Sequence, residues 1–149
     1  MCVQIYSREQ IEQLIAKGDF PQKTAVISFC NCGTVPRDRV NYSRVCNRIM
    51  YIELDDLDFQ DLDDYDEFFP EAQETAEFIV DAYTDGMNII CQCEYGQSRS
   101  AGCAAAIMEH FYRTGINIFK DYNYYPNQVI YNKIYDALQM ISSGTVDLA

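Results

Sequence analysis

The sequence predicts a single α/β domain built on a mainly parallel central sheet that is flanked by helices. Two observations predict this class. Short runs rich in β-branched and apolar residues alternate with longer amphipathic segments along the chain, and strands separated by helices favour parallel pairing. In addition, no internal repeat or low-complexity linker divides residues 1–149. We therefore expect the whole length to form one domain.

The first half of the chain supplies three expected strands and one helix. Residues 3–6 form the first expected strand, and a helix over 7–17 follows, because its first residues have the form of a capping box. Residues 24–29 are a near-continuous apolar run, typical of a buried strand. Residues 30–48 have little periodicity and are expected as a loop with one helical turn. Residues 49–54 form a further expected strand.

The second half begins with an acidic segment and then alternates helix and strand. Residues 55–67 hold eight carboxylates, and a helix is expected over 70–85, where proline suits the first turn. A strand over 88–91 leads into Cys93, followed by expected helices over 100–113 and 127–141. A tyrosine-rich link joins the last two helices. We expect its tyrosines to pack in the fold, with a contact to substrate at the rim of the site as the alternative: Tyr122, Tyr124 and Tyr125.

Three of the predicted strands end in polar or cysteine residues. These ends lie at Cys30, at Asp55 and at Cys93. In open parallel sheets, ligands bind beyond the carboxyl ends of the strands. The sequence therefore predicts that these three strand ends face one site.

The segment from Cys93 to Ser100 indicates the chemistry of that site. It is a short polar loop with one glycine, preceded by a strand and followed by an alanine-rich helix. Backbone N–H groups at the start of a helix can converge on an anion, and the same positive end favours a thiolate. Arg99 offers a planar fork that can hold two phosphate oxygens. The segment therefore indicates attack on a phosphate by Cys93.

The same segment resembles the phosphate-binding loop of cysteine-dependent protein tyrosine phosphatases, most closely that of the dual-specificity type. The family carries histidine, cysteine, five residues, arginine and then serine or threonine; here the order is Gln92, Cys93, five residues, Arg99 and Ser100. The arrangement can be followed from about residue 25 to residue 140. The resemblance implies a phosphotyrosine-phosphatase-like fold and one dual-specificity-type phosphatase domain over residues 1–149. It also implies hydrolysis of phosphomonoesters.

Each residue of the loop has an expected role. Cys93 would attack phosphorus and form a phosphocysteine, while Arg99 would hold the equatorial oxygens. Ser100 would donate to the thiolate and ease breakdown of the intermediate, as the resemblance implies, and it could also cap the helix. The residues expected to bind the substrate phosphate are Glu94, Tyr95, Gly96, Gln97, Ser98 and Arg99.

A general acid must protonate the leaving oxygen. In the family an aspartate on a mobile loop, some thirty residues before the cysteine, supplies this proton, and the acidic segment occupies that place. Asp56 is the favoured candidate because it lies just beyond a strand end. Asp58 and Asp61 remain alternatives, and Asp61 is closer to the usual spacing.

Gln92 is a departure from the family, and it leaves alternative functions open. A glutamine in place of the histidine is expected to orient the loop and support the thiolate less well. One alternative is therefore a phosphate-binding module with weak or lost turnover. A phosphoinositide phosphatase is a second alternative, although Glu94 and Gln97 stand where such enzymes tend to carry lysines.

The cysteines allow one metal-based alternative. Two Cys-x-Cys pairs end neighbouring predicted strands and could bind zinc: Cys30, Cys32, Cys91 and Cys93. Such a site would consume the nucleophile and would leave Arg99 and Ser100 without a role. No metal or other cofactor is therefore expected.

Composition and charge restrict the partners. The net charge of −12 argues against nucleic acid and anionic membranes. No apolar run approaches the roughly 20 residues of a membrane span, and no signal peptide is visible. Seven cysteines, an odd number without regular spacing, suit reduced thiols. We therefore expect a cytoplasmic protein that acts on a phosphorylated protein or peptide.

Overall fold

A computed structural model of the chain describes residues 1–142. Its centre is a sheet of four strands, all of which pair in parallel, in the spatial order β1-β4-β2-β3. The predicted α/β class with a parallel sheet is confirmed. The strands are β1 (Val3–Tyr6), β2 (Thr24–Cys30), β3 (Ile49–Glu53) and β4 (Asn88–Gln92).

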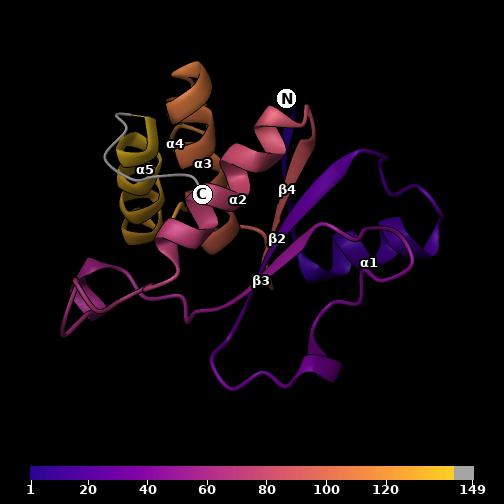
Figure 1. The fold of residues 1–149 in the computed structure, drawn as a ribbon. Coiled ribbons are helices and arrows are strands. Elements are labelled where there is room, and N and C mark those ends of the chain that lie inside the picture. Colours follow the sequence, from indigo (N-terminus) through magenta and orange to yellow (C-terminus); the bar gives the residue numbers. More distant parts are fainter. Residues whose placement is uncertain (143–149) are drawn as a thin grey trace.

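Helices cover both faces of the sheet (Figure 1). The first helix covers one face. The others gather on the opposite face, where the second and the third each pack against the fifth. The helices are α1 (Arg8–Ala16), α2 (Ala72–Thr84), α3 (Arg99–Tyr112), α4 (Ile116–Phe119) and α5 (Gln128–Ser142).

Alternate residues of β4 contribute to two separate cores. Ile89 and Cys91 belong to the large core beneath α2, α3 and α5, whereas Ile90 packs with Ile11 of α1. Successive side chains of a strand point to opposite faces of the sheet. Cys93 accordingly belongs to the large core, and Gln92 bonds on the α1 side, with Tyr42 of the smaller core.

The four predicted helices begin within two residues of the predicted positions, and the largest difference is at the start of α2. Helix α2 begins at Ala72 rather than at residue 70, because Phe69 has a left-handed backbone with φ of 60°. The ring of Phe69 is buried and packs edge-on against Phe29, which holds the chain in this turn. Helix α3 begins one residue earlier than predicted, at Arg99.

The tyrosine-rich link was only partly predicted. It contains the short helix α4, which has too few residues to give a periodic pattern. Tyr124 packs against the large core as expected. The prediction of packing was wrong for the other two tyrosines, because Tyr122 and Tyr125 are 96% and 72% exposed.

Among the described residues, 1–142, no helix combines the length and the apolar character that crossing a membrane requires.

Candidate active site

The carboxyl ends of β2, β3 and β4 meet at one place, as the sequence predicts. Nη1 of Arg99, the first residue of α3 after the loop that follows β4, donates to Oδ1 of Asn31 and to the carbonyl of Leu54, each at 2.8 Å. Asn31 follows β2, and Leu54 follows β3. The Cys32 backbone N–H also donates to Oδ1 of Asp55 at 3.0 Å. The three strand ends therefore form one polar cluster.

Cys93 comes directly after β4, at the start of the segment that leads to Arg99. Its side chain is buried, and its Sγ lies 3.0 Å from Oγ of Ser100. The backbone N–H of Gly96 donates to the same sulfur at 3.3 Å. The hydroxyl of Ser100 and the N–H of Gly96 therefore both contact this sulfur.

The loop after Cys93 requires glycine at position 96. Gly96 has φ of +67°, and a Cβ there would lie 2.6 Å from the backbone nitrogen of Ser7. The loop is fixed to the same segment by a bond from the Arg8 N–H to the Glu94 carbonyl at 3.1 Å. The close approach of the loop to the β1–α1 junction therefore excludes any side chain at this position.

The loop presents backbone donors at the start of α3. The N–H of Gly96 is engaged by the thiol. Four other loop residues have an N–H that donates to no acceptor within residues 1–142: Glu94, Tyr95, Gln97 and Ser98. Unpaired N–H groups that precede a helix form a typical cradle for an anion.

Arg99 combines burial with an unpaired donor. The residue is 4% exposed, and its Nη1 is held by the ends of β2 and β3. Its Nε is buried and has no hydrogen-bond partner among the described residues. An unpaired buried donor on a charged group is costly. A bound oxyanion would supply the missing acceptor.

Of the three candidate acids, Asp56 is the one bonded directly to the loop. Its Oδ1 accepts from Oγ of Ser98 at 2.7 Å and from Nδ2 of Asn127 at 3.0 Å. These bonds place its carboxylate beside the last turn of the loop. That Asp56 acts as the acid stays a prediction.

Asp58 and Asp61 are engaged elsewhere. Both belong to a short 3₁₀ turn, Phe59–Asp61, where Asp58 accepts from the Phe59 N–H and Asp61 accepts from the Asp58 N–H. Asp58 also lies 3.3 Å from the backbone nitrogen of Gln128. In this structure both carboxylates cap backbone groups of the turn.

Asn127 is a site residue that the sequence did not indicate. It is 1% exposed, and its backbone N–H donates to the Ser98 carbonyl at 3.0 Å. Its Nδ2 donates to Asp56 and also to the Leu57 carbonyl at 2.7 Å. Its Oδ1 accepts from the N–H of Ile130, so it also caps α5. From the sequence, the position of Asn127 directly before an apolar helix indicates a helix cap only and not a contact with Asp56.

Gln92 points away from Cys93 and binds two buried hydroxyls. Its Oε1 accepts from Oγ of Ser28 at 2.5 Å and from the hydroxyl of Tyr42 at 2.8 Å. Burial raises the pKa of Tyr42 well above its ordinary value, so this hydroxyl stays a donor. Gln92 therefore completes a buried polar cluster with Ser28 and Tyr42 on the α1 side of the sheet.

Replacing Gln92 by methionine, which has a similar volume, is expected to lower the free energy of unfolding by about 1–3 kcal/mol. The cause is the loss of the shared acceptor for the Ser28 and Tyr42 hydroxyls. Denaturant titration measures the loss. In a Tyr42→Phe background, Gln92→Met should lower the free energy of unfolding by a smaller amount, because one hydroxyl no longer needs an acceptor. An equal loss in both backgrounds would contradict this cause.

The cysteines do not form a four-thiol zinc site. The Sγ of Cys91 lies 3.6 Å from that of Cys103 in α3, and both residues are buried. The hydrogen bond with Cys103, together with burial, raises the pKa of Cys91. Burial likewise raises the pKa of Cys30. Within residues 1–142, no group of three or more histidine, cysteine or acidic side chains is placed to hold a metal ion.

Three solved structures with a similar arrangement of elements, two of them named DUSP28 and PTPMT1, show what this chain resembles. Human DUSP28 superposes with a TM-score of 0.58 at 13% identity, over 95% of this chain and 94% of that one. The chain has the fold of a cysteine-dependent, dual-specificity-like phosphatase. PTPMT1 in complex with PI(5)P gives 0.56 at 11% identity, over 97% and 95% of the two chains. A leucine rich repeat and phosphatase domain containing protein from Entamoeba histolytica superposes with a TM-score of 0.56 at 9% identity. The superposition covers 97% of this chain and 91% of that one.

The likeness to this phosphatase fold is one of structure and not of sequence. Comparison with protein-family models finds no match, and neither does comparison with curated proteins.

Proposed function

We propose that the protein is a phosphomonoester hydrolase, namely a protein tyrosine or dual-specificity phosphatase that acts through a phosphocysteine intermediate. The observation that carries this proposal is the buried, unpaired Nε of Arg99 on the same short loop as the Cys93 thiol. A buried cation with a free donor matches a bound oxyanion. The adjacent thiol accepts from the N–H of Gly96 and lies 3.0 Å from the hydroxyl of Ser100, which suits a nucleophile.

In the first step the Cys93 thiolate attacks phosphorus, and the bond from phosphorus to the leaving oxygen breaks. Asp56 gives its proton to that oxygen, so the product leaves as a neutral alcohol or phenol. Arg99 and the free N–H groups of the loop hold the three non-bridging oxygens, where charge develops in the transition state.

In the second step water attacks the phosphocysteine. Asp56, now a carboxylate, takes a proton from the water, and the bond from phosphorus to sulfur breaks. The electron pair returns to Cys93 as a thiolate. Ser100, with Oγ at 3.0 Å, stabilises this leaving sulfur. The products are inorganic phosphate and the original enzyme.

We propose that the substrate is a phosphorylated protein or peptide rather than a phosphoinositide. One structural neighbour, PTPMT1, is described in complex with PI(5)P. In this chain, however, the loop carries Glu94 and Gln97 and no lysine. A ligand with several phosphates would meet a negative charge beside the loop, which disfavours its binding.

The direct test is release of inorganic phosphate from an aryl phosphate. We expect wild-type protein to hydrolyse it, orthovanadate to inhibit, and a chelator to leave the rate unchanged. Loss of activity with chelator that zinc restores would overturn the thiolate mechanism. Binding of phosphate without any hydrolysis would instead favour a binding module.

Replacing Asp56 by asparagine is expected to slow hydrolysis of alkyl or poorly activated aryl phosphates by roughly 10²–10⁴-fold. Phosphates with very good leaving groups need little protonation and should be affected far less. Steady-state rates across a series of leaving groups measure the difference. Asp58→Asn is the matched control, because Asp58 caps a turn. An equal effect of Asp56→Asn on all leaving groups would remove Asp56 from the role of acid.

A further inference from the structure

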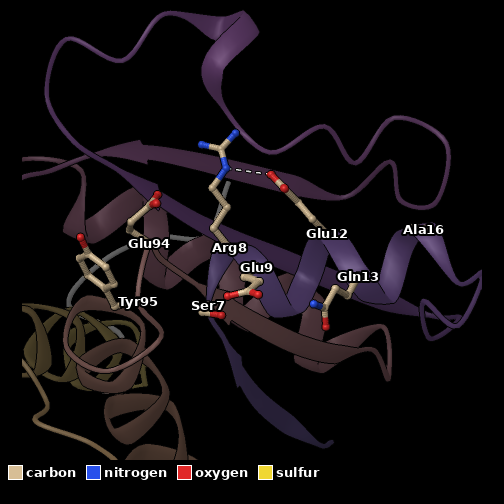
Figure 2. Close-up of a pocket in the computed structure, with 8 residues that line it drawn as sticks. All are labelled: Ser7, Arg8, Glu9, Glu12, Gln13, Ala16, Glu94 and Tyr95. Carbon is tan, nitrogen blue, oxygen red and sulfur yellow. Dashed lines mark hydrogen bonds and ion pairs between the residues drawn. The ribbon is translucent and has the colours of Figure 1, made fainter.

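A groove of about 610 Å³ lies beside the phosphate loop, between that loop and α1. Glu94 and Tyr95 of the loop form one end, and side chains from Ser7 to Ala16 line the rest along the helix (Figure 2). Glu94 directly follows Cys93. An extended peptide spans roughly 3.3 Å per residue. When the phosphorylated residue of a substrate is bound at the loop, a residue only a few positions away in the substrate can therefore contact the groove.

The groove has an uncompensated negative charge. Its one cation, Arg8, forms an ion pair with Glu12 at 2.8 Å and also donates to the Asp38 carbonyl at 2.7 Å. The carboxylates of Glu9 and Glu94 form no ion pair or hydrogen bond within residues 1–142. In Figure 2 the Arg8 guanidinium turns toward Glu12, and both other carboxylates remain unbonded.

Tyr95 adds an aromatic surface to the same groove. Its side chain is 77% exposed and lies at the loop end of the groove. The face of an exposed tyrosine attracts a cation, and its ring also packs against an aliphatic stem. Two free carboxylates and an aromatic ring together suit a lysine or arginine side chain.

We propose that this groove binds a lysine or arginine of the substrate protein, within a few residues of the phosphorylated one. The inference rests on the proposed phosphatase function and specifies its substrate class. The phosphate and the basic side chain would occupy adjacent sites of opposite charge. The loop takes the anion through Arg99 and its N–H groups, and the groove takes the cation through Glu9 and Glu94.

The test compares phosphotyrosyl peptides that carry lysine or glutamine at the positions flanking the phosphotyrosine. At low salt we expect a kcat/KM for the lysine peptides roughly three- to tenfold higher, because each exposed ion pair contributes only a small factor. The preference should shrink in high salt. Glu9→Lys should remove most of the preference while leaving hydrolysis of a small aryl phosphate unchanged.

Glu74→Lys is the matched control, because it makes the same charge change on α2, at an exposed residue outside the groove. If it reduces the preference as much as Glu9→Lys does, net charge rather than the groove is the cause, and the inference is overturned. Equal rates for lysine and glutamine peptides would also overturn it, as would faster hydrolysis of a phosphoinositide than of either peptide.

A binding measurement tests the groove independently of the proposed phosphatase activity. Fluorescence anisotropy with the same labelled peptides reports affinity without turnover. If the protein hydrolyses nothing but still binds lysine peptides more tightly, and Glu9→Lys removes this preference, the inference about the groove is supported and the proposed phosphatase activity is rejected. If aryl phosphate is hydrolysed and neither rate nor affinity distinguishes the peptides, the groove inference is wrong.

Discussion

Cys93→Ser is expected to abolish turnover, with a loss on the order of 10⁶-fold, the scale seen when an essential nucleophile is removed from a hydrolase. A serine hydroxyl at this position is not ionised near neutral pH, and no general base contacts it. Arg99 and the backbone N–H groups of the loop are unchanged in the variant. It should therefore still bind phosphate or a phosphopeptide.

The measurement is phosphate release, together with phosphopeptide affinity for both proteins. Cys2→Ser is the control, because Cys2 is an exposed thiol far along the chain from the loop. Iodoacetate should also alkylate Cys93 faster than the other cysteines near neutral pH. Turnover of Cys93→Ser close to that of wild type would rule out Cys93 as the nucleophile.

Arg99→Lys is expected to lower kcat/KM by roughly 10³-fold or more, the lower end of the range for an arginine that stabilises a phosphoryl transition state. Lysine keeps the charge but has one nitrogen and no planar fork. In Arg99, Nη1 binds the Leu54 carbonyl and the Asn31 side chain, which leaves the other guanidinium nitrogens for phosphate oxygens. The single nitrogen of a lysine cannot make both sets of contacts.

Orthovanadate affinity should fall together with the rate, because the same donors bind both ligands. Arg44→Lys, at an exposed position, is the matched control. Thermal unfolding of both variants separates loss of the fold from loss of recognition. An Arg99→Lys protein that remains folded with wild-type kcat/KM would contradict the role given to Arg99.

The sheet and the loop could be predicted because their signals are local. The apolar run of β2 is buried at nearly every position, and the polar loop after β4 has its glycine where the backbone is left-handed. Parallel pairing then brings the strand ends together, so the meeting of Asn31 and Leu54 at Arg99 follows from the topology.

The supporting contacts could not be predicted, because they join residues distant in sequence. Asn127 and Asp56, which are hydrogen-bonded, lie 71 positions apart in the sequence. No pattern in the sequence around either residue indicates this contact. The sequence favoured Asp56 from its place beyond a strand end, but the bonds that Asp56 accepts from Ser98 and Asn127 could not be predicted. Gly102 belongs to the same contact, because a Cβ there would lie 2.5 Å from the Asn127 carbonyl.

The central claim is that phosphate passes through a covalent bond to Cys93, and trapping that bond tests it most directly. Ser100→Ala removes the hydroxyl 3.0 Å from the sulfur, so breakdown of the intermediate should slow more than its formation. Rapid acid quench with an aryl phosphate that has a very good leaving group, followed by peptide mass spectrometry, should find one phosphoryl group on the peptide that contains Cys93. Continuing phosphate release with no phosphoryl group on Cys93, at any quench time in this variant, would contradict the account.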